Sequence, residues 1–140
     1  MKKLRFWHYL LWFLGSVAAG VALLLLCACL PQGAIDAHVR DAALALKSEG
    51  TYPRVFDTAD TAQLDNYTDA IIMDESRGMT ASRISSVLTN PVHRAAEDPV
   101  EALAIYAEQE ADAPESFFYP RYWMGFRVLT RTALVFLNYL

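Results

Sequence analysis

Hydrophobic positions are concentrated at the start of the chain, in one unbroken run. Residues 6–30 read FWHYLLWFLGSVAAGVALLLLCACL, and His8 and Ser16 are the only clearly polar side chains among them. A bilayer core about 30 Å thick needs roughly 20 apolar residues at ~1.5 Å rise each. Gly15 and Gly20 are tolerated better in a membrane helix than in a soluble one. The run therefore predicts a transmembrane helix over residues 6–30.

Helical spacing of apolar residues returns in four shorter stretches of residues 31–120, and turn residues set their limits. At the start of the last stretch, Asp98 can cap a helix and Pro99 fits its first position. The apolar stripes are narrow and rich in alanine, so we expect these helices to lie against a membrane or other protein instead of building their own core. The predicted helices lie between Gly33 and Gly50, from Thr61 to about Glu75, from Thr80 or Ser82 to Asn90, and from Asp98 to Pro114.

A second apolar run ends the sequence. Residues 116–140 read SFFYPRYWMGFRVLTRTALVFLNYL, with aromatic side chains crowded ahead of the apolar part, as at the headgroup level of a membrane helix. The nearly apolar residues 132–140 would rise only about 14 Å, half a bilayer core. Two interpretations stay open for residues 121–140: an interfacial amphipathic helix, or the incomplete second transmembrane helix of a longer multi-pass protein, which we favour.

Charge predicts the orientation of the first span. Residues 1–5 carry three basic and no acidic side chains, whereas residues 31–120 carry six basic and sixteen acidic ones, a formal charge of −10. Basic flanks stay in the cytoplasm, so we expect residues 1–5 inside and residues 31–120 outside the cell membrane. The acidic segment also excludes nucleic acid as a partner. The fold class predicted is an all-α membrane protein with a helical extracytoplasmic loop.

The two cysteines indicate neither a disulfide framework nor a metal motif. Cys27 and Cys29 are one residue apart, which is poor spacing for a bridge between them. Residues 26–29 loosely resemble a bacterial lipoprotein processing site, with Cys29 as the lipidated residue. The simpler interpretation makes both cysteines small apolar residues at the outer end of the helix. His8, His38 and His93 are interpreted as surface residues.

The densest candidate for chemistry is Asp65-Asn66-Tyr67-Thr68-Asp69. On a helix, Asp65 and Asp69 stand at positions i and i+4, so their carboxylates would share one face. Such a pair can hold a divalent cation or supply a general base. The alternative is a solvated acidic face.

A second candidate is Arg121-Tyr122-Trp123, where an arginine flanked by aromatic rings can bind a lipid phosphate. The alternative there is a plain interfacial anchor.

Two stretches carry a resemblance. Residues 63–73 (QLDNYTDAIIM) and residues 119–126 (YPRYWMGF) resemble a group of uncharacterised multi-pass membrane proteins of Gram-positive bacteria, with LDNYTDA and RYWHGY-like motifs. Met124 and Phe126 depart from that pattern, which has histidine and tyrosine there. The resemblance implies that the chain is the amino-terminal part, or a remnant, of a large membrane protein. Its layout is similar to that of polyprenyl-phosphate-sugar-dependent, GT-C-like glycosyltransferases.

Two functional hypotheses follow. In the first, the chain belongs to a glycosyltransferase that uses a lipid-linked sugar: Asp65 and Asp69 handle a divalent cation or an acceptor proton, and Arg121, with Tyr122 and Trp123, holds the lipid phosphate. In the second, the chain is a non-enzymatic, membrane-anchored helical interaction module, or a lipoprotein, of the cell envelope. The expected partners are the lipid bilayer, a lipid-linked sugar and another membrane protein.

Overall fold

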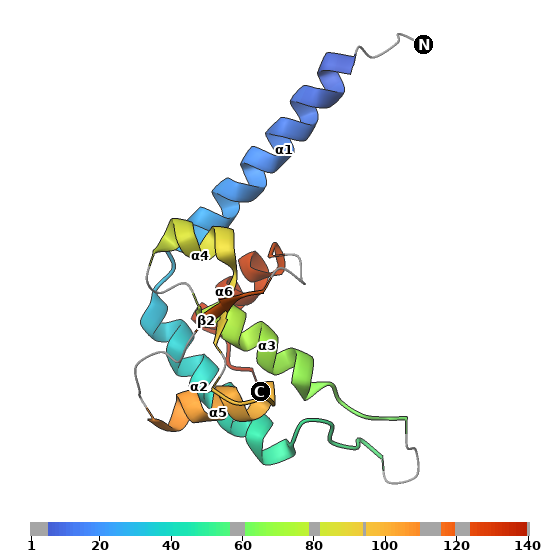
Figure 1. Cartoon of the computed structure of the whole chain (residues 1–140), viewed down its shortest axis with the longest axis vertical. Coiled ribbons are helices and arrows are strands. Elements are labelled where there is room, and N and C mark those ends of the chain that lie inside the picture. The colour runs from blue at the N-terminus through green and yellow to red at the C-terminus, as the bar shows by residue number, and fades with distance from the viewer. Residues whose placement is uncertain are drawn as a thin grey trace.

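The computed structural model describes residues 6–56, 61–78, 82–93, 95–109, 116–119 and 124–139. The chain is mostly helical, and one long helix projects from a body formed by the other elements (Figure 1). This helix is α1, Phe6–Cys27, whose 22 residues span about 33 Å. In the described part of the chain it is the one helix long and apolar enough to cross a membrane. It ends three residues earlier than predicted, because residues 28–30 form a turn.

The body packs four helices around a small apolar core: α2 (Gln32–Glu49), α3 (Asn66–Arg77), α5 (Pro99–Gln109) and α6 (Phe126–Phe136). The expectation that these helices would not build a core of their own is wrong. Alanine lets the helices approach closely, so a few larger side chains suffice to fill the space between them. The buried residues of the core are Ile35, Val39, Ala42, Ala43, Leu46, Ala70, Met73, Val100, Leu103 and Leu134.

The helix limits follow local capping chemistry. Gly50 ends α2 with a positive φ of 86°, a conformation that costs glycine little. Asp98 accepts a hydrogen bond from the Val100 amide at the start of α5, as its sequence predicts. The predicted second helix is α3, but it begins at Asn66 and not at Thr61, because Asp65 is its N-cap.

A short helix and two short strands complete the body. Helix α4, Arg83–Thr89, is capped by Ser82 and ends at Asn90, whose φ of 43° is left-handed. Strand β1, Pro91–His93, follows at once and pairs antiparallel with β2, Ser116–Phe118, so that Val92 lies opposite Phe117. The helical spacing of the sequence did not predict this pairing.

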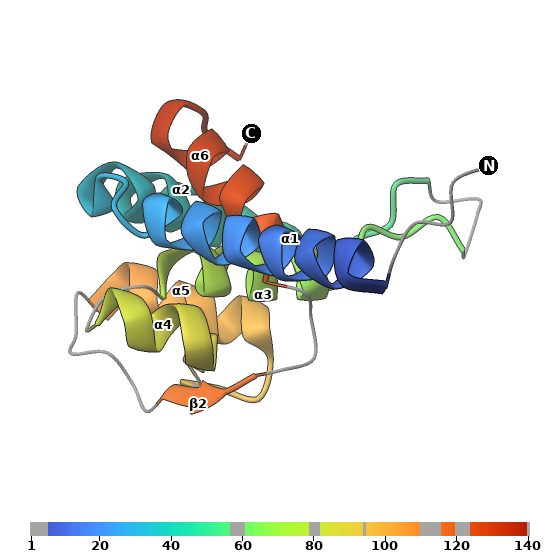
Figure 2. The same ribbon diagram turned by 90° about the horizontal axis from the view of Figure 1, so that it is seen from above.

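Helix α6 connects the body to the base of α1. Seen from above, α2 and α6 lie on one side of α1, and α4 and α5 lie on the other (Figure 2). The 11 residues of α6 span about 16 Å. Because residues 121–123 and 140 lie outside the described residues, the continuation of this segment as a second span stays a prediction.

Candidate functional site

The predicted acidic pair lies at the start of α3, and both carboxylates have hydrogen-bond partners. Asp65 accepts from the Thr68 amide at 3.1 Å and from the Thr68 hydroxyl at 2.7 Å. Asp69 accepts from the Tyr139 hydroxyl at 2.7 Å, across to the end of the chain. Asp65 is the N-cap residue of α3, so its carboxylate is engaged by the first turn of the helix.

Asn66, between them, is a structural residue. It is buried, and its side-chain amide donates to the Glu49 carboxylate at 3.0 Å and to the Gly50 carbonyl at 2.8 Å. These bonds fasten the beginning of α3 to the end of α2. The Asn-Tyr-Thr triplet matches a glycosylation acceptor, but the burial of its asparagine leaves no room for a glycan.

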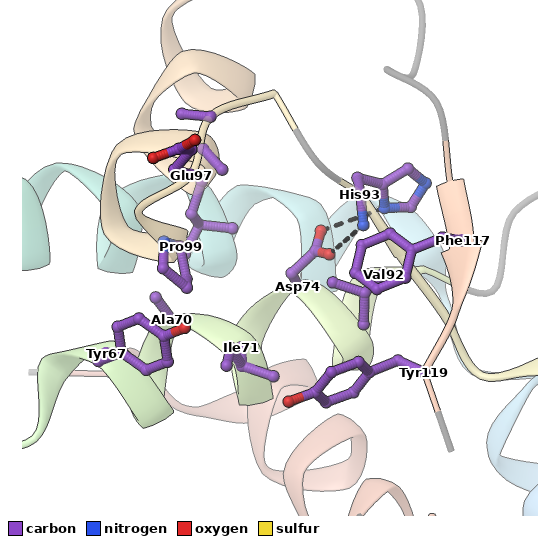
Figure 3. A pocket seen from close by; sticks show the side chains of 13 residues that line it. Tyr67, Ala70, Ile71, Asp74, Val92, His93, Glu97, Pro99, Phe117 and Tyr119 are labelled. Carbon is purple, nitrogen blue, oxygen red and sulfur yellow. Dashed lines mark hydrogen bonds and ion pairs between the residues drawn. The ribbon is translucent and has the colours of Figure 1, made fainter. Parts of the chain in front are cut away.

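The other end of α3 holds a buried polar cluster that the sequence analysis missed. Asp74 accepts from the His93 amide at 2.6 Å, contacts His93 Nδ1 at 3.2 Å, and accepts from Arg77 Nε at 2.9 Å. The Arg77 guanidinium also lies 3.4 Å from the centre of the Tyr106 ring, a cation–π contact. The carboxylate thereby links α3 to β1. Figure 3 shows the Asp74 carboxylate bonded to both the backbone amide and the ring of His93, so this carboxylate holds the histidine in place.

A cavity of about 170 Å³ lies beside this cluster, between α3, β1, β2 and the start of α5. Tyr67 and Ile71 come from α3, and Phe117 and Tyr119 come from the second strand and the residue beyond it (Figure 3). Its polar lining includes Asp74, His93 and Glu97, and the described lining residues include no lysine or arginine. The cavity is therefore aromatic and apolar with an acidic margin.

A second buried polar cluster surrounds Glu75. The carboxylate accepts from Asn90 Nδ2 at 3.1 Å, and Asn90 also donates to the Tyr119 carbonyl at 2.8 Å. Burial raises the pKa of the Glu75 carboxyl above its ordinary value, while the Asn90 hydrogen bond and the positive charge of Arg127 oppose the rise. Glu75 Oε2, Asn90 Oδ1 and Arg127 Nε have no hydrogen-bond partner in the described structure.

Arg127 and Arg131, one turn apart on α6, are completely buried. Arg127 donates to the Ser86 carbonyl at 3.2 Å and to the Glu75 carbonyl. Arg131 donates to the carbonyls of Cys27, at 3.3 Å, and Ser76. These carbonyls belong to the last turns of α1, α3 and α4, which attract positive charge. The Cys27 and Ser86 carbonyls also accept from the backbone amides of Leu30 and Asn90. Two guanidinium groups thus cap three converging helix ends.

An apolar groove separates α1 from the start of α6. Its volume is about 620 Å³, and Gly20 and Leu24 of α1 face Met124 and Leu129 across it. The outward side of α6 carries Leu129, which is 74% exposed, and Phe136, which is 76% exposed. Helix α6 therefore buries both arginines and Leu134, and exposes Leu129 and Phe136.

The remaining predicted site residues are Arg121, Tyr122 and Trp123, which lie outside the described residues. Within the described ranges, no group of three or more metal-ligating side chains lies close enough to hold a metal ion. Cys27 is buried and donates its thiol to the Arg127 carbonyl at 3.2 Å, whereas Cys29 is exposed.

Two of the histidines differ from their interpretation as surface residues. His93 is buried against Asp74, and His38 Nδ1 lies 2.6 Å from the Leu134 carbonyl. Asp74, Glu75 and Arg77 were overlooked because charged side chains are usually exposed. The one available signal was the spacing of Arg127 and Arg131, at i and i+4 in a largely apolar stretch.

Comparison with known proteins adds no assignment: no family model, curated protein or solved structure matches the chain.

Proposed function

We propose that the chain is the amino-terminal part of a multi-pass bacterial membrane protein, in which α1 is the first span. The helical body then lies on the extracytoplasmic side as an interaction module, held at the outer surface of the membrane. The acidic balance of residues 31–120 and the basic residues 1–5 support this orientation.

The observation that carries the proposal is that α6 buries two arginines while it exposes Leu129 and Phe136. Its exposed Leu129 and Phe136 would be unfavourable in water, and Leu129 lines the apolar groove beside α1. Its arginines, which lipid would exclude, are turned inward and hydrogen-bonded. A helix of this kind suits a position against lipid or against further membrane helices.

Spin labels test whether α6 contacts the membrane while the far side of the body faces water. We would place a label at Leu129 or, as the matched control, at the exposed Ser48 of α2, after replacing both native cysteines by serine. In membranes, the label at Leu129 should collide with oxygen more than with a water-soluble nickel chelate, and the label at Ser48 should show the reverse. Equal access of the chelate to both positions would reject the membrane contact of α6.

Single-cysteine variants in the same cysteine-free background test the orientation. Ser48→Cys should react with a membrane-impermeant maleimide in intact cells, and Lys3→Cys should react only after permeabilisation. The opposite pattern would overturn the extracytoplasmic placement.

A glycosyltransferase that uses a lipid-linked sugar donor is the second candidate. One observation favours it: Met124 and Gly125, which follow Arg121–Tyr122–Trp123 directly in the sequence, line the groove beside the apolar α1. A lipid phosphate held by Arg121 would then have its hydrocarbon chain next to an apolar surface. The engagement of Asp65 by Thr68 and of Asp69 by Tyr139 makes this candidate weaker than the interaction module.

A further inference from the structure

We propose that the cavity between α3, β1 and β2 binds a small organic cation, an ammonium group that carries methyl or short alkyl substituents. This ligand class is independent of both functions proposed above. The argument uses the walls of the cavity, its charge and its size.

The aromatic walls are fixed in position. The Tyr67 ring stacks on Tyr52, with centroids 6.2 Å apart and planes 7° apart. The Phe117 and Tyr119 rings meet edge to face at 5.9 Å. All but Tyr52 line the cavity, two of them on the strand side and Tyr67 on the opposite helix (Figure 3). Rings held around one space attract an organic cation through their electron-rich faces.

The charge of the lining also favours an organic cation. Asp74 is already paired with Arg77 and bonded to His93, so the carboxylate left for a ligand is that of the exposed Glu97. Among the lining residues that the structure describes there is no lysine or arginine to bind an anionic ligand such as a phosphate. The surrounding acidic segment would raise the local concentration of cations.

The size suits a small ligand group. A cavity of about 150 Å³ holds a benzene molecule, so the volume of about 170 Å³ fits a group like tetramethylammonium. The cavity is open on one side, so this group can be free or the end of a larger molecule.

Calorimetry on the full chain in an uncharged maltoside detergent tests the proposal, with tetramethylammonium as the probe. We expect saturable binding, and none by the neutral, similarly shaped tert-butanol. Tyr67→Leu should weaken binding about 2- to 30-fold, and Tyr67→Phe should restore it, as expected for one cation–π contact. Glu97→Gln should weaken binding, whereas Glu101→Gln, a matched charge change outside the lining, should leave it unchanged.

Several results would overturn the proposal: no saturable binding of tetramethylammonium, equal binding of the neutral probe, or equal effects of the two glutamate changes. Tetramethylammonium binding by the chain in nanodiscs then distinguishes a lipid headgroup from a dissolved amine as the ligand. Loss of tetramethylammonium binding in phosphatidylcholine discs, but not in phosphatidylglycerol discs, identifies a lipid headgroup as the ligand. Competition by free choline with no difference between the discs identifies a dissolved amine.

Discussion

Replacement of Arg131 by methionine should destabilise the body. The guanidinium donates to the Cys27 and Ser76 carbonyls and to Gln32 Oε1, the last at 3.0 Å. Methionine fills much of the same volume but donates nothing. The Ser76 carbonyl would lose its charged donor, at about 1–3 kcal/mol, while the Cys27 carbonyl would keep its hydrogen bond from the Leu30 amide.

A compensating gain reduces this loss. Burying a guanidinium costs several kcal/mol, and methionine removes that cost. Because the lost hydrogen bonds and the removed desolvation cost are of similar size, we expect a net loss of about 1 kcal/mol in the free energy of unfolding, roughly fivefold in the folding equilibrium constant. Arg131→Lys keeps the charge but loses the planar guanidinium. Its free energy of unfolding should therefore lie between those of the native chain and Arg131→Met.

Urea unfolding in mild detergent, followed by circular dichroism, measures the change. With a slope of ~1–3 kcal/mol per molar urea, the midpoint should fall by about 0.3–1 M. Leu129→Met on the exposed side of α6 is the control, and should stay within about 0.5 kcal/mol of the native chain. A midpoint for Arg131→Met equal to that of the control would refute the reasoning, because it would mean that desolvation cancels the capping bonds.

Two further predictions concern the carboxylates of α3. Glu75→Gln should stabilise the body increasingly as pH rises. Because the folded state raises the pKa of Glu75, the native carboxyl favours folding only while it is protonated. This contribution is lost as pH rises through the folded-state pKa, and glutamine does not lose it. Urea midpoints at pH 4 and pH 8 check this, and a difference that stays constant with pH would contradict it. If the chain or its full-length parent is a transferase, Asp65→Asn and Asp69→Asn should abolish sugar transfer from a polyprenyl-phosphate donor in membranes. Asparagine still caps α3 and still accepts from Tyr139, so the loss would not be one of folding; normal transfer in both variants and in Arg121→Lys would reject that site.

The sequence predicted what depends on near neighbours. Gly50 and the Asp98-Pro99 pair marked helix ends correctly, because capping involves residues only a few positions apart. The start of α3 was misplaced, since residues 61–64 are extended or turn residues that happen to contain apolar side chains at helical spacing.

What depends on distant parts of the chain was not predictable. Asp74 meets His93 across 19 residues, and Arg131 meets Cys27 across 104. Burial of a charged side chain is unfavourable by itself and becomes stable only when three-dimensional packing brings acceptors to it. No local pattern indicates such packing. The clusters at the end of α3 and on α6 were therefore missed, whereas the long apolar helix α1 was predicted.

The capping of α1, α3 and α4 by the two arginines of α6 has a mechanical consequence. The hydrogen bond from Arg131 to the Cys27 carbonyl ties the last turn of α1 directly to the body, so the short turn between α1 and α2 cannot act as a free swivel. Membrane helices tilt to match the thickness of the bilayer around them. If α1 spans a membrane as proposed, a tilt of α1 would therefore rotate the whole body with it, and would change the angle at which the body faces the membrane surface and its neighbours.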